Sequence, residues 1–310
     1  MASSIPFIAD EQTQAGIVYR PAPGLRRLVA ANPGPFTYTG TGTYVLGATR
    51  LAVIDPGPAL PDHIAGLRRL IDGAGLEAII VTHNHRDHSP AAAALKAATG
   101  APILGCAPLS RGGDGGHADE GLDTAYRPDR VLADGETIAG DGWTLRTLAT
   151  PGHISNHLCF EWLEANALFS GDHVMGWSTS VVLPPEGDMG DYVASLKRVR
   201  DRDYDRLWPT HGQPVDQPGP FIDALIAHRR AREEQILACL EAGLGDIAAI
   251  VARLYQDVPN HLHGAAGQSV LAHLIDLCRR GLVTAEPAPE IDAVYHLRGP
   301  GLATGAKSHT

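Results

Sequence analysis

The chain has 310 residues, of which 44% are hydrophobic and 19% are charged, and its formal net charge is −10. This length allows one or two folded domains, and the acidic balance argues against bulk electrostatic attraction to nucleic acid. The start, MASSIPFIADEQ, lacks the basic and apolar regions of a signal peptide, and no apolar run approaches the roughly 18 residues of a membrane span. We therefore expect a cytoplasmic protein with no membrane partner.

Apolar runs of strand length recur through the first two-thirds of the chain and alternate with helical patterns. Residues 61–72 open with a proline and carry apolar residues on one face, and residues 89–99 form an alanine-rich helix that Gly100 ends. Residues 134–145 are typical of a hairpin. The predicted strands are, in chain order, RRLVAA, TYVLG, RLAVID, AIIVTH, APILG, WTLRTLAT, HLCFEW, ALFSGD and RLWPTH. Strands that alternate with helices predict a layered α/β fold.

From about residue 218 the pattern becomes helical. Three helical segments, 221–240, 247–254 and 270–278, precede the strand-like LVTAE, which is the outline of a winged helix. Many such modules bind DNA, but residues 221–283 hold six Arg and no Lys against seven acidic residues. We therefore expect no DNA partner. The predicted domains are 1–217 and 218–297, with a tail over 298–310.

The stretch IIVTHNHRDHSPAAA, residues 79–93, places three histidines and an aspartate within six positions. His83 and His85 are two apart, so both rings can point the same way at a strand end. Asp87 and His88 follow where the helix begins. Nitrogen and carboxylate ligands without a thiolate suit zinc, with iron or manganese as substitutes. An ordinary polar surface loop would rarely contain four ligand-type residues in six positions, so a metal site is the better explanation.

Further candidates are single residues that share one kind of position. His153, Asp172 and His211 each follow an apolar run, as His83 does, and Asp55 closes LAVID. Functional residues of layered α/β folds gather at the carboxyl ends of strands, so these segments can converge on one edge. Each residue alone is explained equally well by a structural role, and the shared position is what favours a site.

The order H-x-H-x-D-H followed by His, Asp and His resembles the metallo-β-lactamase superfamily over residues 30–215. A closer likeness is to its lactamase-beta-2-like branch, which carries a small winged-helix domain after the catalytic one. The segments that show it are NPGPFTYTGTGTYVLG (32–47), HRDHSPA (85–91), TPGHISNHLCF (150–160), GDHVMGWSTSVVLPPEGDMGDYVASL (171–196), HRRAREEQIL (228–237) and AHL (272–274). Gly42 departs from the pattern, because relatives often have asparagine there, which puts substrate contacts near it in doubt.

The resemblance implies a four-layer αβ/βα sandwich with a dinuclear metal site at the sheet edges. It assigns His83, His85 and His153 to the first metal. It assigns Asp87, His88 and His211 to the second metal, with Asp172 bridging the two. The expected cofactors are two Zn²⁺ per chain, with Mn²⁺ or Fe²⁺ as alternatives.

Two divalent ions about 3.5–4 Å apart can share a hydroxide that attacks an ester, thioester or lactam carbonyl. We expect Asp55 to orient a ligand histidine and consider Asp87 for handling a proton. His157, His173 and Trp177 are candidates for substrate contact, and a structural role explains each of them as well.

The leading hypothesis is a zinc-dependent hydrolase of a small or carrier-linked acyl substrate. The alternative is an endoribonuclease acting on single-stranded RNA, for which residues 195–206 offer a mixed-charge helix. The acidic balance and the 38 residues between Asp172 and His211, too few for a nuclease-type insertion, count against it. Iron-dependent redox chemistry is less favoured, because diiron relatives place a glutamate at the position of His85 and need a flavin domain. A non-catalytic binding protein would show an eroded ligand set, and nothing in the sequence specifies an oligomeric state.

Overall fold

The computed structural model describes residues 5–10, 12–109, 121–259 and 262–298. The chain divides into two compact units, Met1–Arg229 and Arg230–Thr310, and the division falls within helix α4 (Pro218–Glu241). The domain boundary expected between residues 217 and 218 stays a prediction. The expected tail over 298–310 lies outside the described residues except for Arg298.

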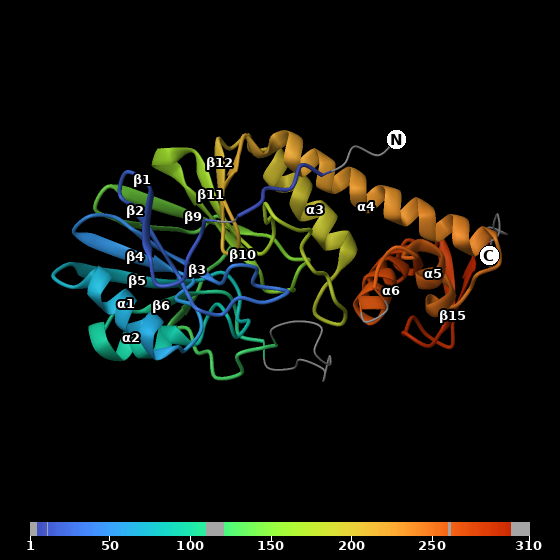
Figure 1. The fold of residues 1–310 in the computed structure, drawn as a ribbon, viewed down its shortest axis with the longest axis horizontal. Coiled ribbons are helices and arrows are strands. Elements are labelled where there is room, and N and C mark those ends of the chain that lie inside the picture. Colours follow the sequence, from blue (N-terminus) through green and yellow to red (C-terminus); the bar gives the residue numbers. More distant parts are fainter. Residues whose placement is uncertain (1–4, 11, 110–120, 260–261, 299–310) are drawn as a thin grey trace, which may run out of the picture. The chain divides into compact units, whose positions relative to one another are not determined.

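The first sheet of unit 1 contains seven strands in chain order. They are β1 (Val18–Ala22), β2 (Leu25–Val29), β3 (Gly42–Leu46), β4 (Arg50–Ile54), β5 (Gly75–Val81), β6 (Ile103–Gly105) and β7 (Arg130–Val131). Strands β1 to β4 pair antiparallel, and β4 to β7 pair parallel. Helices α1 (Pro61–Ile71) and α2 (Ala91–Thr99) connect parallel strands and cover the outer face of this sheet (Figure 1).

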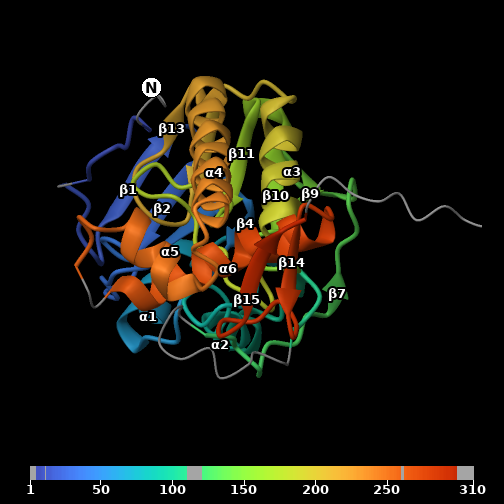
Figure 2. The ribbon, with the colours of Figure 1, turned by 90° about the vertical axis from the view of Figure 1, so that its right-hand side faces the viewer.

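The second sheet has six strands in the order β13-β12-β11-β10-β9-β8. They are β8 (Thr137–Gly140), β9 (Trp143–Ala149), β10 (Leu158–Trp162), β11 (Ala167–Gly171), β12 (Arg206–Pro209) and β13 (Val215–Asp216). Only β11 and β12 pair in parallel. Helix α3 (Met189–Arg200) lies beside this sheet (Figure 2), buries Tyr192 and Leu196, and donates from Ser195 Oγ to Pro151 O over 2.7 Å.

The two sheets share one apolar core, which confirms the expected four-layer sandwich. Tyr44 from the first sheet and Phe169 from the second meet edge to face with ring centroids 5.2 Å apart. All nine strands named from the sequence are present, and so are the hairpin and helices α1 and α2. Strand β1, which the sequence did not indicate, is a sheet edge that contains Pro21, and proline is tolerated in strands mainly at edges.

Unit 2 contains the end of α4, helices α5 (Ile247–Leu254) and α6 (His263–Arg279), and the hairpin β14 (Val283–Glu286) with β15 (Val294–Leu297). Its core includes Ile236, Ile250, Val270 and Tyr295. The expected three helices and hairpin are therefore confirmed. Among the described residues, no helix combines the length and the apolar character that crossing a bilayer requires.

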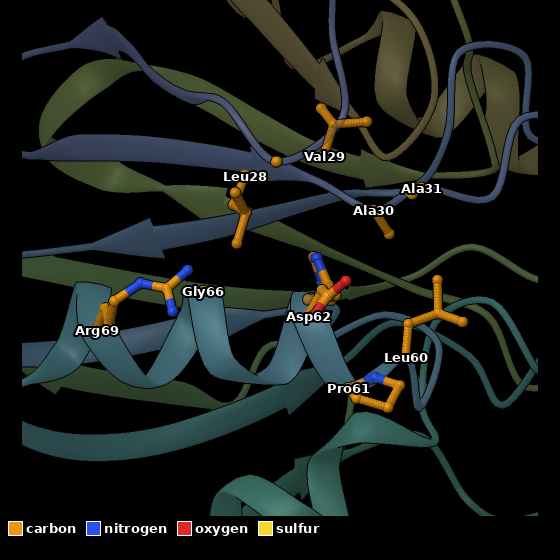
Figure 3. A pocket seen from close by; sticks show the side chains of 11 residues that line it. Leu28, Val29, Ala30, Ala31, Leu60, Pro61, Asp62, Gly66 and Arg69 are labelled. Carbon is orange, nitrogen blue, oxygen red and sulfur yellow. The ribbon is translucent and has the colours of Figure 1, made fainter.

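A cavity of about 310 Å³ lies between strand β2 and helix α1. Leu28 and Val29 of β2 lie across it from Asp62 and Arg69 of α1 (Figure 3). The buried His63 ring also lines this cavity, and its Nε2 lies 3.0 Å from Thr43 Oγ1 and 3.1 Å from Pro56 O. Burial, opposed by the bond to Pro56, lowers the pKa of His63 to about 4.

We predict that His63→Gln makes stability less sensitive to acid. Above pH 6.5, His63 is neutral in both folded and unfolded chains, so its lowered pKa does not affect the free energy of unfolding there. Below it, the unfolded chain binds the proton first, and stability falls until the pH reaches about 4. We expect the free energy of unfolding, measured with urea, to fall between pH 7 and pH 5 by about 2 kcal/mol more in the wild type than in the variant. His296→Gln, at an exposed position of β15, is the control; equal losses in all three proteins would contradict the prediction.

Candidate metal centre

The structure brings all seven predicted ligand side chains to one place in unit 1. Three overlapping groups have ligand atoms within 4.8 Å of one another: His83, His85 and His153; His83, His88 and Asp172; and Asp87, His88 and His211. Each residue lies at or just beyond the end of a strand, in the turn after β5, β9, β11 or β12. None of the seven is more than 8% exposed, so the centre is enclosed by protein.

The first group consists of histidine nitrogens. His85 Nδ1 lies 2.9 Å from His83 Nε2 and 3.3 Å from His153 Nε2. The rings of His83 and His153 stand nearly perpendicular, at 89°. Three imidazole nitrogens therefore face a common point.

The second group mixes nitrogens with carboxylate oxygens. Asp87 Oδ2 lies 3.2 Å from His88 Nε2 and 3.1 Å from His211 Nε2. Asp172 joins the groups, because its Oδ2 lies 3.4 Å from His88 Nε2 and 3.9 Å from His153 Nε2. Its Oδ1 lies 3.4 Å from His211 Nε2.

These spacings fit divalent metal ions. Ligands about 2.0–2.1 Å from a tetrahedral ion are roughly 3.3 Å from one another, close to the separations within each group. His88 Nε2 and Asp172 Oδ1 are buried and make no hydrogen bond within the described part of the chain. Buried polar atoms normally have partners, and a cation satisfies these two. The cluster is therefore a metal-binding site by donor set and spacing.

Four of the histidines are held by the nitrogen that faces away from the centre. His88 Nδ1 donates to Asp55 Oδ2 over 3.0 Å, and His153 Nδ1 donates to Val181 O over 2.6 Å. His211 Nδ1 donates to Gly40 O over 3.3 Å, and His83 Nδ1 lies 3.0 Å from Thr82 Oγ1. An imidazole whose outer nitrogen carries the hydrogen presents a lone pair at its inner nitrogen. The surroundings therefore select the tautomer that binds metal.

Asp55 is the common acceptor behind the centre. Besides His88, its carboxylate accepts from Thr82 N, Thr82 Oγ1 and Thr210 Oγ1, each over 2.9 to 3.0 Å. It also connects to His83 through the Thr82 hydroxyl. Sequence reasoning missed both threonines, although each directly precedes a predicted ligand, His83 or His211. Asp55 has φ 47°, and aspartate tolerates this left-handed conformation better than most residues.

The electrostatics of the site favour positive charge. Burial lowers the pKa of His88, but the carboxylates of Asp87, Asp172 and Asp55 outweigh it and raise the pKa well above 6.5. Burial also lowers the pKa of His211, but Asp172 and Asp87 outweigh it and raise the pKa to about 10. His83 has the opposite balance: burial, His88 and His85 hold its pKa well below 6.5. A field that attracts protons to the second group also attracts a divalent cation, which competes for the same lone pairs.

The three predicted substrate contacts lie in different surroundings. His157 is 1% exposed, accepts from Asp172 N over 3.2 Å and lies 2.8 Å from Thr150 Oγ1. His173 is completely buried against Tyr192. Trp177 is half-buried and stacks on Tyr38 with ring centroids 4.6 Å apart, next to Gly212. His157 and His173 are as buried as the ligand residues and Trp177 is half-buried, and substrate contact by any of the three stays a prediction.

A small depression of about 20 Å³ borders the first ligand group. Its lining consists of His85, His153, Ile154, Val181, Leu183 and Glu186. Glu186 accepts from Ser155 Oγ over 3.1 Å. Three aliphatic side chains and one carboxylate therefore lie beside two ligands of the first group.

Two family models match the chain. Residues 39–211 match the metallo-beta-lactamase superfamily, and residues 247–290 match the beta-lactamase associated winged helix domain. A beta-lactamase-like protein 2 homolog of Caenorhabditis elegans is 33% identical over 83% of this chain and 85% of its own length. An atrochrysone carboxyl ACP thioesterase of Aspergillus chevalieri is 32% identical over 82% of this chain and 77% of its own length.

The fold agrees with these matches. A beta-lactamase domain protein of Burkholderia ambifaria superposes with a TM-score of 0.76 at 23% identity, over 94% of this chain and 96% of that one. The first family match covers more than half of the chain and contains every residue of the cluster. The expected resemblance and the winged-helix module are confirmed. The chain belongs to the metallo-beta-lactamase superfamily and is a hydrolase with a metal-binding centre and a winged-helix domain after it.

Proposed function

We propose that this hydrolase is a dinuclear zinc enzyme that cleaves acyl thioesters, including carrier-linked ones. The observation that carries the proposal is the pair of ligand groups joined by Asp172, which lies 3.9 Å from His153 Nε2 in the first and 3.4 Å from His211 Nε2 in the second. In this proposal, His83, His85 and His153 hold one ion. Asp87, His88 and His211 hold the other, and Asp172 contacts both. Acyl substrates are supported by two relatives whose names describe ACP thioesterases.

The hydrogen-bond directions favour a leaving group that needs no proton. Two ions held by these groups would supply a water activated near neutral pH and would polarise the acyl carbonyl oxygen. The N–H groups of His88, His153 and His211 point outward to Asp55, Val181 and Gly40. They therefore cannot donate to a leaving group at the centre. A thiol, with a pKa of about 8.5, departs as its anion far more readily than an alcohol does.

The surroundings of the centre argue for a neutral acyl group over a phosphodiester. The depression at His85 and His153 is lined by Ile154, Val181 and Leu183, and the Glu186 carboxylate repels phosphate. Trp177 is our candidate for a wall of the substrate site. The aliphatic side chains and the acidic Glu186 support an uncharged acyl substrate.

Residues 195–206, on which the RNA alternative rests, contain arginines whose positive charges are paired with acidic side chains. The helix expected over residues 195–206 is only partly present, because α3 ends at Arg200. The arginines in and after it are paired with acidic residues: Arg198 with Asp134, Arg200 with Asp223, Arg202 with Glu161 and Arg206 with Asp216. Paired cations attract phosphates weakly.

We predict that zinc-loaded protein hydrolyses a butyryl-pantetheine thioester faster than the matching oxyester. Since a general acid contributes on the order of 10²–10⁴-fold, we expect kcat/KM for the thioester to exceed that for the oxyester by a comparable factor. Thiol or acid release measures both rates, and protein stripped of metal by a chelator and then reloaded is the control.

End-labelled single-stranded RNA belongs in the same experiment. Metal-dependent cleavage of RNA without thioester hydrolysis would overturn the proposal in favour of an endoribonuclease. Equal rates on both esters would overturn the thioester preference while leaving metal-dependent acyl hydrolysis intact.

A further inference from the structure

The segment that enters strand β3 borders the second ligand group. Gly40 O accepts from His211 Nδ1, and Thr41 Oγ1 donates to Asp87 Oδ2 over 3.3 Å. Thr41 is completely buried. The oxygen that Thr41 contacts is the same one that faces His88 Nε2 and His211 Nε2.

The bonds around Thr41 have a defined direction. Asn32 Oδ1 accepts from Thr41 N over 3.0 Å, which sets the orientation of the Asn32 amide. Its Nδ2 therefore faces Thr41 Oγ1, at 2.9 Å, and donates to it. A hydroxyl has a single hydrogen, and with Asn32 donating, that hydrogen is left for Asp87. The chain of donation runs from Asn32 through Thr41 to Asp87 Oδ2.

The loop is built to hold this geometry. Thr37 Oγ1 donates to Asn32 O over 2.6 Å and anchors the asparagine backbone. Gly40 has φ 124°, and a Cβ there would lie 2.2 Å from Ala30 O and 3.3 Å from Asn32 Oδ1. Only glycine at this position lets the segments around Ala30 and Gly40 approach closely enough for the Asn32 amide to make both of its hydrogen bonds with Thr41.

We propose that Asn32 and Thr41 are positioning residues that hold the Asp87 carboxylate in place as a ligand of the second metal ion. This inference rests on the ligand set of the proposed function. Partners that orient metal ligands typically contribute 10–100-fold to metal affinity. Because the hydroxyl donates, Asp87 is the acceptor in this contact, which suits a ligand oxygen and gives the carboxylate one fixed orientation.

The test is zinc titration of metal-free protein by competition with a chromophoric chelator, for wild type, Thr41→Val, Thr41→Ser and Thr43→Val. Thr43 is the matched control: it lies two residues further on, in β3, is also completely buried, and its hydroxyl bonds to His63 and not to a ligand. We expect wild type to bind two ions. Thr41→Val should weaken one of the two binding steps 10–100-fold, and Thr41→Ser should restore it. Thr43→Val should bind zinc as wild type does.

Asn32→Ala provides a second variant that leaves the buried threonine in place. We expect it to weaken the same binding step, since the hydroxyl is then free to turn away from Asp87. Wild-type affinity in both Thr41→Val and Asn32→Ala would overturn the inference, as would equal losses in Thr41→Val and Thr43→Val. A wild type that binds fewer than two ions would instead overturn the dinuclear function.

Discussion

Replacing Asp172 with alanine is expected to abolish metal-dependent hydrolysis. Its oxygens lie 3.4 Å from His88 Nε2 and His211 Nε2 of the second group, and its Oδ2 lies 3.9 Å from His153 Nε2 of the first, so among the described residues it is the carboxylate that borders both proposed ion positions. Its loss removes a shared ligand and leaves a less negative site. If the ions supply several kcal/mol of transition-state stabilisation, kcat/KM should fall about 10³-fold or more. Bound zinc, measured by atomic emission, should fall from two ions per chain to one or none.

The comparison needs a variant that changes an aspartate elsewhere. Asp72→Ala lies at the exposed end of α1 and should keep both rate and zinc content. Identical purification of all three proteins controls for a contaminating hydrolase. An Asp172→Ala protein that still binds two ions and hydrolyses the substrate would contradict the assignment of this residue as the shared ligand.

The second large effect is expected for Asp55→Asn. Asparagine has the same shape and tolerates the φ of 47° found here, but it turns one acceptor oxygen into a donor NH₂. That group must then face either the Thr82 hydrogens or His88 Nδ1, which all donate in the native protein. If it faces His88, the imidazole hydrogen moves to Nε2 and the inner lone pair is lost. We expect zinc affinity to fall 10–100-fold.

Histidine NMR resolves the mechanism of this loss. A change of the His88 tautomer together with weaker zinc binding is the expected result, and Asp72→Asn is the matched control at an exposed position. Saturating zinc should recover part of the activity, because the ligands themselves remain. Unchanged zinc affinity in Asp55→Asn would show that Asp55 does not orient His88 for metal binding.

Much of the fold follows from patterns that lie within short segments. The buried run AIIV predicts β5, and Gly100, with φ 75°, ends α2 where the sequence indicates. Periodicity and capping are local properties, so they can be recognised without the partner segments. Strands β7 and β13, of two residues each, escaped prediction. They are too short for a pattern, and their existence depends on the neighbouring strand.

The sequence by itself determined which residues can bind metal, because His83, His85, Asp87 and His88 lie within six positions and the remaining candidates follow predicted strands. Only the tertiary structure decided how these side chains are held. The Asp55 carboxylate meets Thr210, 155 residues away, and Gly40 meets His211, 171 residues away. The contact of Thr41 with Asp87, 46 residues away, likewise joins the segment before β3 to the turn after β5. Such hydrogen bonds depend on strand pairing and on the packing of two sheets, which bring distant segments together and leave no local pattern in the chain.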